Sequence, residues 1–104
     1  MNHLFKNMKP KEAEVTSDIR RFLKTMGIPH FKKLQGLGSP KGIADIIGCY
    51  KGRFLAIEVK RPGEKPTPDQ QEFLDRYSSA GGICFVARSV DDVIQSLGIQ
   101  EKWR

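Results

Sequence analysis

Two acidic residues in this sequence stand where apolar residues would be expected. Asp45 interrupts the apolar run 43–47, and Glu58 lies near the end of a second apolar run, 54–59. Burying an ionised carboxylate is costly unless it is paired with a cation or binds a metal. Two carboxylates on adjacent strands would offer the oxygen ligands that Mg²⁺ and Mn²⁺ prefer, with water and phosphate oxygens as further ligands. The pair therefore indicates metal-assisted chemistry on a phosphate group.

A lysine and a third carboxylate could complete such a site. Lys60 follows Glu58 by two positions, so both side chains point to the same face of a strand. An ammonium group there could orient or help deprotonate an attacking water and offset phosphate charge. Glu12 begins the core-facing stripe of a predicted helix and could join the site from that side. Glu14 is its competitor, but its spacing to Val15 places it nearer the flank of the helix.

Each of these residues also has a purely structural interpretation. A Glu-x-Lys sequence is common on exposed strand faces, and Asp45 could cap a turn or pair with a lysine. The spacing favours the site, because Lys51 and Gly52 form a tight turn between two strands. Asp45 and Glu58 are nearly symmetric about that turn, so antiparallel pairing would set them opposite each other.

The elements that must position these residues follow the order α-β-β-β-α-β-α. Apolar spacing, glycines and capping residues set their limits, and the sheet strand at 83–87 is expected to be covered on both faces. The predicted elements are a helix over 11–26, strands over 30–34, 43–50 and 53–60, a helix between Thr67 and Gly81, a strand over 83–87, and a helix between Ser89 and Gly98.

The chain of 104 residues is short enough to form one domain. We expect an N-terminal arm over 1–10, a single folded domain over 11–98 and a C-terminal tail over 99–104. The glycine-rich segment 35–42 is a loop within that domain.

Composition limits the function classes. Lys and Arg outnumber Asp and Glu by 18 to 12, and the net charge of +6 favours a polyanionic partner, nucleic acid first. No apolar run approaches the ~20 residues that cross a bilayer, and the N-terminus lacks a signal-peptide core, so we expect no membrane and a cytoplasmic location. The two cysteines, Cys49 and Cys84, are expected to be reduced core residues, and they have no zinc-like spacing to the histidines.

The ordered set of motifs resembles the PD-(D/E)xK nuclease superfamily, and within it the VRR-NUC (virus-type replication-repair nuclease) family. The resemblance covers about residues 12–97, and the complete set is far more specific than the Glu-x-Lys motif alone. The segments that carry it are Glu12 with Val15 and Ile19, Gly42–Asp45, Phe54–Pro62, Thr67–Gln70 with Phe73 and Leu74, and Ala80–Ala87.

The resemblance implies metal-dependent hydrolysis of DNA on a restriction-endonuclease-like α/β fold, with a core of order αβββαβ, a C-terminal helix and a mixed central sheet flanked by helices. It implies metal ligation by Asp45, Glu58 and the backbone carbonyl of Val59. It implies catalytic roles for Lys60 as the catalytic lysine, Glu12 as the helix carboxylate and Gln70 as a supporting polar residue.

The sequence departs from the superfamily at one position. The residue before the aspartate is usually proline, and here it is Ala44. Proline at that point mainly shapes the backbone, so we expect the departure to affect the angle at which the chain enters the strand.

A set of polar and basic residues gathers in sequence around the proposed site, and we expect it to contact nucleic acid. A generally solvated basic surface and a plain connecting loop are the alternatives. The expected contacts are Lys32, Lys33, Ser39, Lys41, Arg61 and Lys65.

Together these features predict a Mg²⁺- or Mn²⁺-dependent DNA endonuclease. One site cuts one strand, so we expect a homodimer that acts on branched or junction DNA, in phage or prophage replication or repair within a bacterial or phage-infected host cell. The alternatives are a catalytically silent nucleic-acid-binding domain of the same fold, an RNA endonuclease, and a structural or interaction protein.

Overall fold

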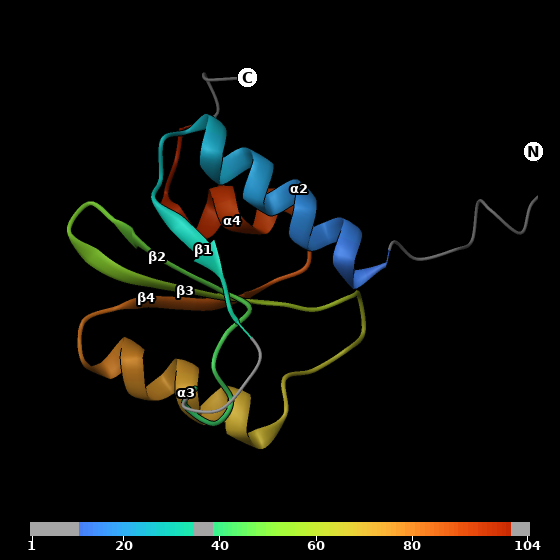
Figure 1. Cartoon of the computed structure of the whole chain (residues 1–104), viewed down its shortest axis with the longest axis vertical. Coiled ribbons are helices and arrows are strands. Elements are labelled where there is room, and N and C mark those ends of the chain that lie inside the picture. The colour runs from blue at the N-terminus through green and yellow to red at the C-terminus, as the bar shows by residue number, and fades with distance from the viewer. Residues whose placement is uncertain (1–10, 35–38, 101–104) are drawn as a thin grey trace, which may run out of the picture.

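The computed structural model describes residues 11–34 and 39–100. These residues form three layers, with helices on both faces of a four-stranded sheet (Figure 1). The predicted arm over 1–10 and residues 101–104 of the predicted tail lie outside the described residues, as does part of the loop. The described elements are α2 (Glu12–Thr25), β1 (His30–Lys32), β2 (Ile46–Tyr50), β3 (Arg53–Val59), α3 (Pro68–Ser79), β4 (Ile83–Ala87) and α4 (Val90–Leu97).

The sheet has the strand order β1-β2-β3-β4. β1 and β2 pair antiparallel, β2 and β3 form the predicted antiparallel hairpin, and β4 runs parallel to β3 after the crossover through α3. The element order and the mixed sheet agree with the α/β, restriction-endonuclease-like class predicted from the sequence. β2 begins at Ile46, three residues later than predicted, because the chain through residue 45 is a bend.

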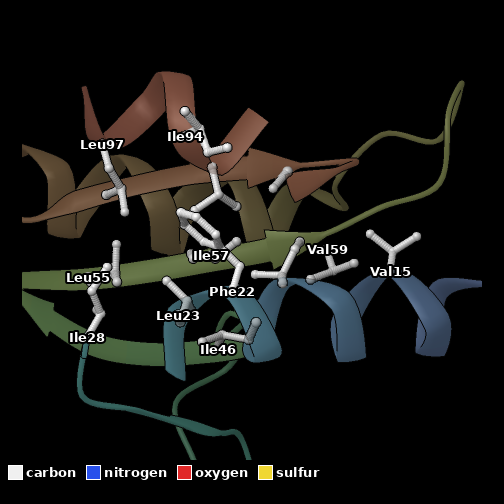
Figure 2. Packing of buried hydrophobic residues seen from close by; sticks show 13 residues of the cluster. Val15, Phe22, Leu23, Ile28, Ile46, Leu55, Ile57, Val59, Ile94 and Leu97 are labelled. Carbon is white, nitrogen blue, oxygen red and sulfur yellow. The ribbon is translucent and has the colours of Figure 1, made fainter. Parts of the chain in front are cut away.

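Side chains of β3 alternate between two cores, one on each face of the sheet. Leu55, Ile57 and Val59 pack against α2 and α4 in the larger cluster (Figure 2). Ala56 packs with Phe73 of α3 in the smaller cluster on the opposite face. Glu58 follows Ala56 by two positions and points to the same face of β3. It is the acidic residue on a face that is otherwise apolar within this strand.

Local signals set the helix ends. The hydroxyl of Thr67 accepts a hydrogen bond from the backbone N–H of Gln70 at 3.2 Å, and the Gln70 side-chain oxygen accepts one from the Thr67 N–H at 2.9 Å. This reciprocal capping box begins α3 where it was predicted. The hydroxyl of Ser89 accepts a hydrogen bond from Asp92 N–H at the start of α4, and Gly98 ends that helix with a φ of 69°.

β4 is covered on both faces, as the sequence predicted. Helices α4 and α3 both contact it, Ile83 and Phe85 pack against the larger core cluster, and Cys84 and Val86 pack against the smaller one. Its position at the edge of the sheet leaves four of its five residues half-buried. One expectation about burial is wrong. Cys49 is exposed rather than part of the core, because it lies close to the hairpin turn, at the rim of the packed layers. Cys84 is half-buried.

None of the helices among residues 11–34 and 39–100 is long and apolar enough to cross a membrane.

Candidate active site

Asp45 lies at the point where the β2–β3 ladder ends. The last backbone pair is Ile46 with Ile57, so the next step of the register sets Asp45 opposite Glu58, as the sequence predicted. The Asp45 carboxylate reaches across to β3, and its Oδ2 accepts a hydrogen bond from the backbone N–H of Val59 at 2.8 Å. This bond fixes the carboxylate against the end of β3.

Close packing holds the segment that leads to Asp45. Gly42 has a φ of +73°, and a Cβ atom there would lie 2.2 Å from the carbonyl oxygen of Asp69 in the first turn of α3. Only glycine fits both the backbone conformation and this approach. Ala44 is fully buried in the core beside α3. The chain therefore enters β2 along the start of α3.

Glu58 is almost completely buried, with 1% of its surface exposed. Its Oε2 lies 3.5 Å from Nζ of Lys60, whereas its Oε1 has no hydrogen-bond partner among the described residues. Burial raises the pKa of Glu58 from 4.5 to about 7, and the nearby charge of Asp45 adds to the rise. Lys60 and Lys33 act in the opposite direction. The carboxylates of Asp45 and Glu58 therefore lie close enough for their charges to interact.

Lys60 stands directly after β3. Its backbone N–H donates to the carbonyl of Ala87 at 3.1 Å, which ties this end of β3 to β4. The side chain is 13% exposed. Its ammonium group is therefore partly buried and held beside the Glu58 carboxylate at the edge of the site.

An open groove of about 530 Å³ leads to Asp45 from outside, and we call it the site groove. Glu12 and Glu14, both in the first turn of α2, are both exposed, but only Glu12 lines the site groove. The helix carboxylate that shares a surface with Asp45 is thus Glu12. The residues that line the site groove are Glu12, Ala13, Thr16, Lys32, Lys33, Leu34 and Asp45.

Lys33 has a closer connection to the site than the sequence suggested. Its Nζ lies 3.3 Å from Oδ1 of Asp45, and its backbone N–H donates to the Asp45 carbonyl at 2.8 Å. β1 pairs with β2 through Lys32 and Ile46, so Lys33 is the next residue along and meets Asp45. Recognising this antiparallel pairing across the glycine-rich loop is the signal that would have identified it.

The other predicted site residues are engaged elsewhere or exposed. Gln70 contributes its side-chain oxygen to the capping box of α3. Lys41 pairs with Asp69 at 3.5 Å, and Arg61 pairs with Glu64 at 3.2 Å. The Arg61 guanidinium and backbone N–H both donate to the Glu64 carboxylate and lower its pKa.

Three more residues complete the predicted nucleic-acid set. Lys32 is exposed and lines the site groove. Lys65 is exposed, and the hydroxyl of Ser39 donates to the carbonyl of Leu34 at 3.3 Å.

The donor set of the site fits a divalent cation. Among the described residues, no three His, Cys, Asp or Glu side chains gather tightly enough to form a complete cage. Asp45 and Glu58 instead supply two carboxylates, one of which has a buried oxygen without a partner. Mg²⁺ and Mn²⁺ suit such an incomplete oxygen site, because water and phosphate oxygens provide the remaining ligands.

Comparison with known proteins supports the fold. No family model matches the sequence, and no curated protein matches it. One solved structure, described as a "VRR_NUC domain", has a TM-score of 0.69 and 24% identity over 85% of this chain and 95% of its own. Another, a "VRR_NUC domain protein", has a TM-score of 0.73 and 22% identity over 88% of each chain. The chain therefore has the fold of these VRR_NUC domains, and the predicted resemblance is confirmed at the level of the fold.

Proposed function

We propose that this chain is a divalent-metal-dependent endonuclease that hydrolyses phosphodiester bonds in DNA. The observation that carries the proposal is the pair of the buried Glu58 and the partly buried Asp45 at the end of the β2–β3 hairpin, with Lys60 beside it. The fold shared with proteins described as VRR_NUC domains supports the same conclusion.

In the proposed mechanism, Asp45 and Glu58, together with the backbone carbonyl of Val59, would hold Mg²⁺ or Mn²⁺. Such an ion would supply Lewis-acid activation and neutralise charge on the phosphate. The Lys60 ammonium, held 3.5 Å from Glu58, orients the attacking water and stabilises its developing charge. Glu12 faces the same groove and positions water or substrate from the α2 side. Gln70 supports the site indirectly, because its capping box fixes the turn of α3 against which Gly42 packs.

The proposed substrate is structured DNA. The net charge of +6 favours a polyanion, and a single site in a small chain cuts one strand at a time. A homodimer would present two sites, which suits branched or junction DNA in phage or prophage replication or repair in the cytoplasm of a bacterial cell. Lys32, Lys33, Ser39, Lys41, Arg61 and Lys65 are the proposed contacts to the DNA.

A cleavage panel tests the proposal. Supercoiled plasmid, a four-way junction, linear duplex and a matched RNA are each incubated with Mg²⁺, with Mn²⁺ or with EDTA. The expected result is metal-dependent cleavage of DNA by the parent protein and none by Asp45→Ala. An absence of cleavage by both the parent and the variant would identify a catalytically silent domain. Preferential cleavage of RNA would overturn the DNA assignment. Light scattering at micromolar concentration tests the dimer, and a fully active monomer would contradict it.

A further inference from the structure

A row of residues at four-residue spacing runs along α2. Each lies about 40° around the helix from the one before, so neighbours in the row lie side by side. The row begins with Glu12 and Thr16, both of which line the site groove. It continues with Arg20 and Lys24, which line a second open groove of about 620 Å³. We call this second groove the basic groove, and it is lined by Arg20, Arg21, Lys24, Gly27, Ile28, Pro29 and His30.

The two grooves follow one another along the same pair of elements. α2 and β1 contact each other and run in opposite directions (Figure 1). The end of β1, at Lys32, therefore lies beside the start of α2 in the site groove, and its beginning, at His30, lies beside the second half of α2 in the basic groove. His30 and Lys32 are two residues apart and share one face of the strand. The two grooves have no lining residue in common, but they follow one another between α2 and β1, and we call them together the furrow.

The furrow changes in charge along its length. At the site end, two carboxylates share the lining with two lysines, Lys32 and Lys33, whereas the basic groove contains three cationic side chains and no acidic one. Arg21 pairs with Asp18 at 3.7 Å, but both side chains are highly exposed, so the pair is weak. Within the described part of the chain, Arg20 and Lys24 form no salt bridge. Their charges remain available to an external anion.

We propose that the basic groove binds the phosphate backbone of DNA on one side of the cleaved bond. The inference rests on the proposed function, because it places the cut at the Asp45 end of the furrow. A long polyanion suits an open groove lined by exposed arginine and lysine side chains, which contact phosphates without reading sequence. Arg20 and Lys24 follow Glu12 by eight and twelve residues on α2, which corresponds to about 12 and 18 Å at about 1.5 Å per residue. Those distances span about 3.5 to five base pairs at about 3.4 Å each, so the groove would contact DNA at about that distance from the cut.

Binding without cleavage tests this directly. A fluorescein-labelled linear DNA duplex is titrated in EDTA with the parent, Arg20→Glu and Arg76→Glu proteins, at several salt concentrations. Arg76 is the matched control, because it is an exposed helical arginine of α3, on the opposite face of the sheet, and its substitution changes the net charge equally. Arg20→Glu is expected to weaken binding about tenfold and to lower the salt slope by about one, with a change of less than about twofold for Arg76→Glu. Equal losses in the two variants would overturn the proposal.

Cleavage of shortened substrates locates the contact. A four-way junction with Mn²⁺ is cut by parent and Arg20→Glu, first with long arms and then with the arm on one side of the cut reduced to about three base pairs. Arg20→Glu is expected to raise KM and leave kcat unchanged on long arms, and to match the parent on the short arm. If the KM values of parent and Arg20→Glu still differed whichever arm was shortened, the assigned position of the basic groove on the DNA would be wrong.

The outcomes separate the two proposals. If the parent binds DNA through Arg20 but cuts nothing, the endonuclease proposal fails and the basic groove stands. If the parent cuts DNA and Arg20→Glu binds and cuts like Arg76→Glu, the basic groove fails and the endonuclease stands. Thermal unfolding of each variant checks folding, which an exposed helical substitution to glutamate should leave almost unchanged.

Discussion

The carboxylate of Asp45 accepts a hydrogen bond from the backbone N–H of Val59 at 2.8 Å, one residue beyond the last backbone pair of the hairpin. A side chain here takes the role that a strand carbonyl has elsewhere in the sheet. The other carboxylate oxygen faces Lys33 at 3.3 Å. Asp45 therefore both extends the β2–β3 pairing by one hydrogen bond and supplies one of the two carboxylates of the proposed metal site.

This double role predicts different effects for two substitutions of Asp45. Asp45→Ala leaves the Val59 N–H without its acceptor, which should lower the free energy of unfolding by about 1–3 kcal/mol. Asp45→Asn keeps an oxygen acceptor and should cost less than about 1 kcal/mol. Both should reduce cleavage more than about 100-fold, because a metal ligand is lost. Urea unfolding in EDTA and plasmid nicking measure the two effects. An Asp45→Ala protein as stable as the parent would contradict the structural role, and full activity of Asp45→Asn would contradict the catalytic one.

Glu58 should make the metal-free protein less stable as pH rises. Its pKa is about 7 in the folded protein and ordinarily 4.5, so the folded state keeps this proton more tightly than the unfolded state. The stability that this proton contributes is complete below pH 4.5 and is lost as pH rises through 7. The loss should be about 2–3 kcal/mol and absent from Glu58→Gln. The check is the difference in unfolding free energy between parent and variant at pH 5 and pH 8 in EDTA. If the unfolding free energies of parent and Glu58→Gln changed equally with pH, the assignment of this effect to Glu58 would be wrong.

Lys60 should affect the chemical step rather than binding. Lys60→Met removes the ammonium beside Glu58 and should lower kcat by about 10²–10⁴-fold, with DNA affinity in EDTA almost unchanged. Lys65→Met provides the comparison, because Lys65 is an exposed, proposed DNA contact whose loss should raise KM alone. Single-turnover cleavage rates measured beside binding curves separate the two. The assignment of Lys60 fails if its loss weakens binding and leaves the cleavage rate intact.

Lys33 should compete with the metal for Asp45. Its ammonium group lies 3.3 Å from the carboxylate, so Lys33→Met should tighten Mn²⁺ binding by about three- to tenfold, equivalent to roughly 1 kcal/mol of ion pairing. Lys32→Met is the control, because Lys32 lines the same groove but is exposed. Calorimetric titration with Mn²⁺ measures both. Equal changes in the two variants would indicate a general charge effect and contradict direct competition.

Gly42 should tolerate alanine less well than another glycine of the same backbone conformation. Gly42 and Gly27 have φ values of +73° and +71°, but an added Cβ meets the Asp69 carbonyl only at Gly42. Gly27→Ala should therefore cost about 1 kcal/mol for its backbone strain, and Gly42→Ala clearly more. Chemical denaturation of both proteins gives the difference. Equal costs would show that the contact between the loop and α3 is soft.

The fold was largely predictable because its signals are local. The Lys51–Gly52 turn sets the hairpin register, and Thr67, Pro68 and Gln70 mark the start of α3 through local contacts alone. Burial near the edges was harder to predict, because Cys49 is apolar in type and yet lies at the rim of the sheet. Sequence alternation shows which face a residue occupies, but not whether a helix extends far enough to cover it.

The site was predictable where one hairpin builds it. The facing of Asp45 and Glu58 follows from counting residues from the turn, and the structure shows this register. The Lys33–Asp45 ion pair depends instead on β1 pairing with β2 across a long glycine-rich loop. Loop length does not determine such pairing, so the sequence predicted Lys33 as a DNA contact but not its ion pair with Asp45.

The two-residue turn at the far end of the hairpin governs which insertions the proposed site can survive. Lys51 and Gly52 adopt φ values of 50° and 78°, and every residue pair up to Ile46 and Ile57 is counted from them. One residue inserted into β3 would rotate Glu58 onto the opposite face of the sheet, away from Asp45. One residue added to each strand would lengthen the hairpin and leave the two acids facing each other. Relatives that keep the acid pair should therefore differ in hairpin length by even numbers of residues.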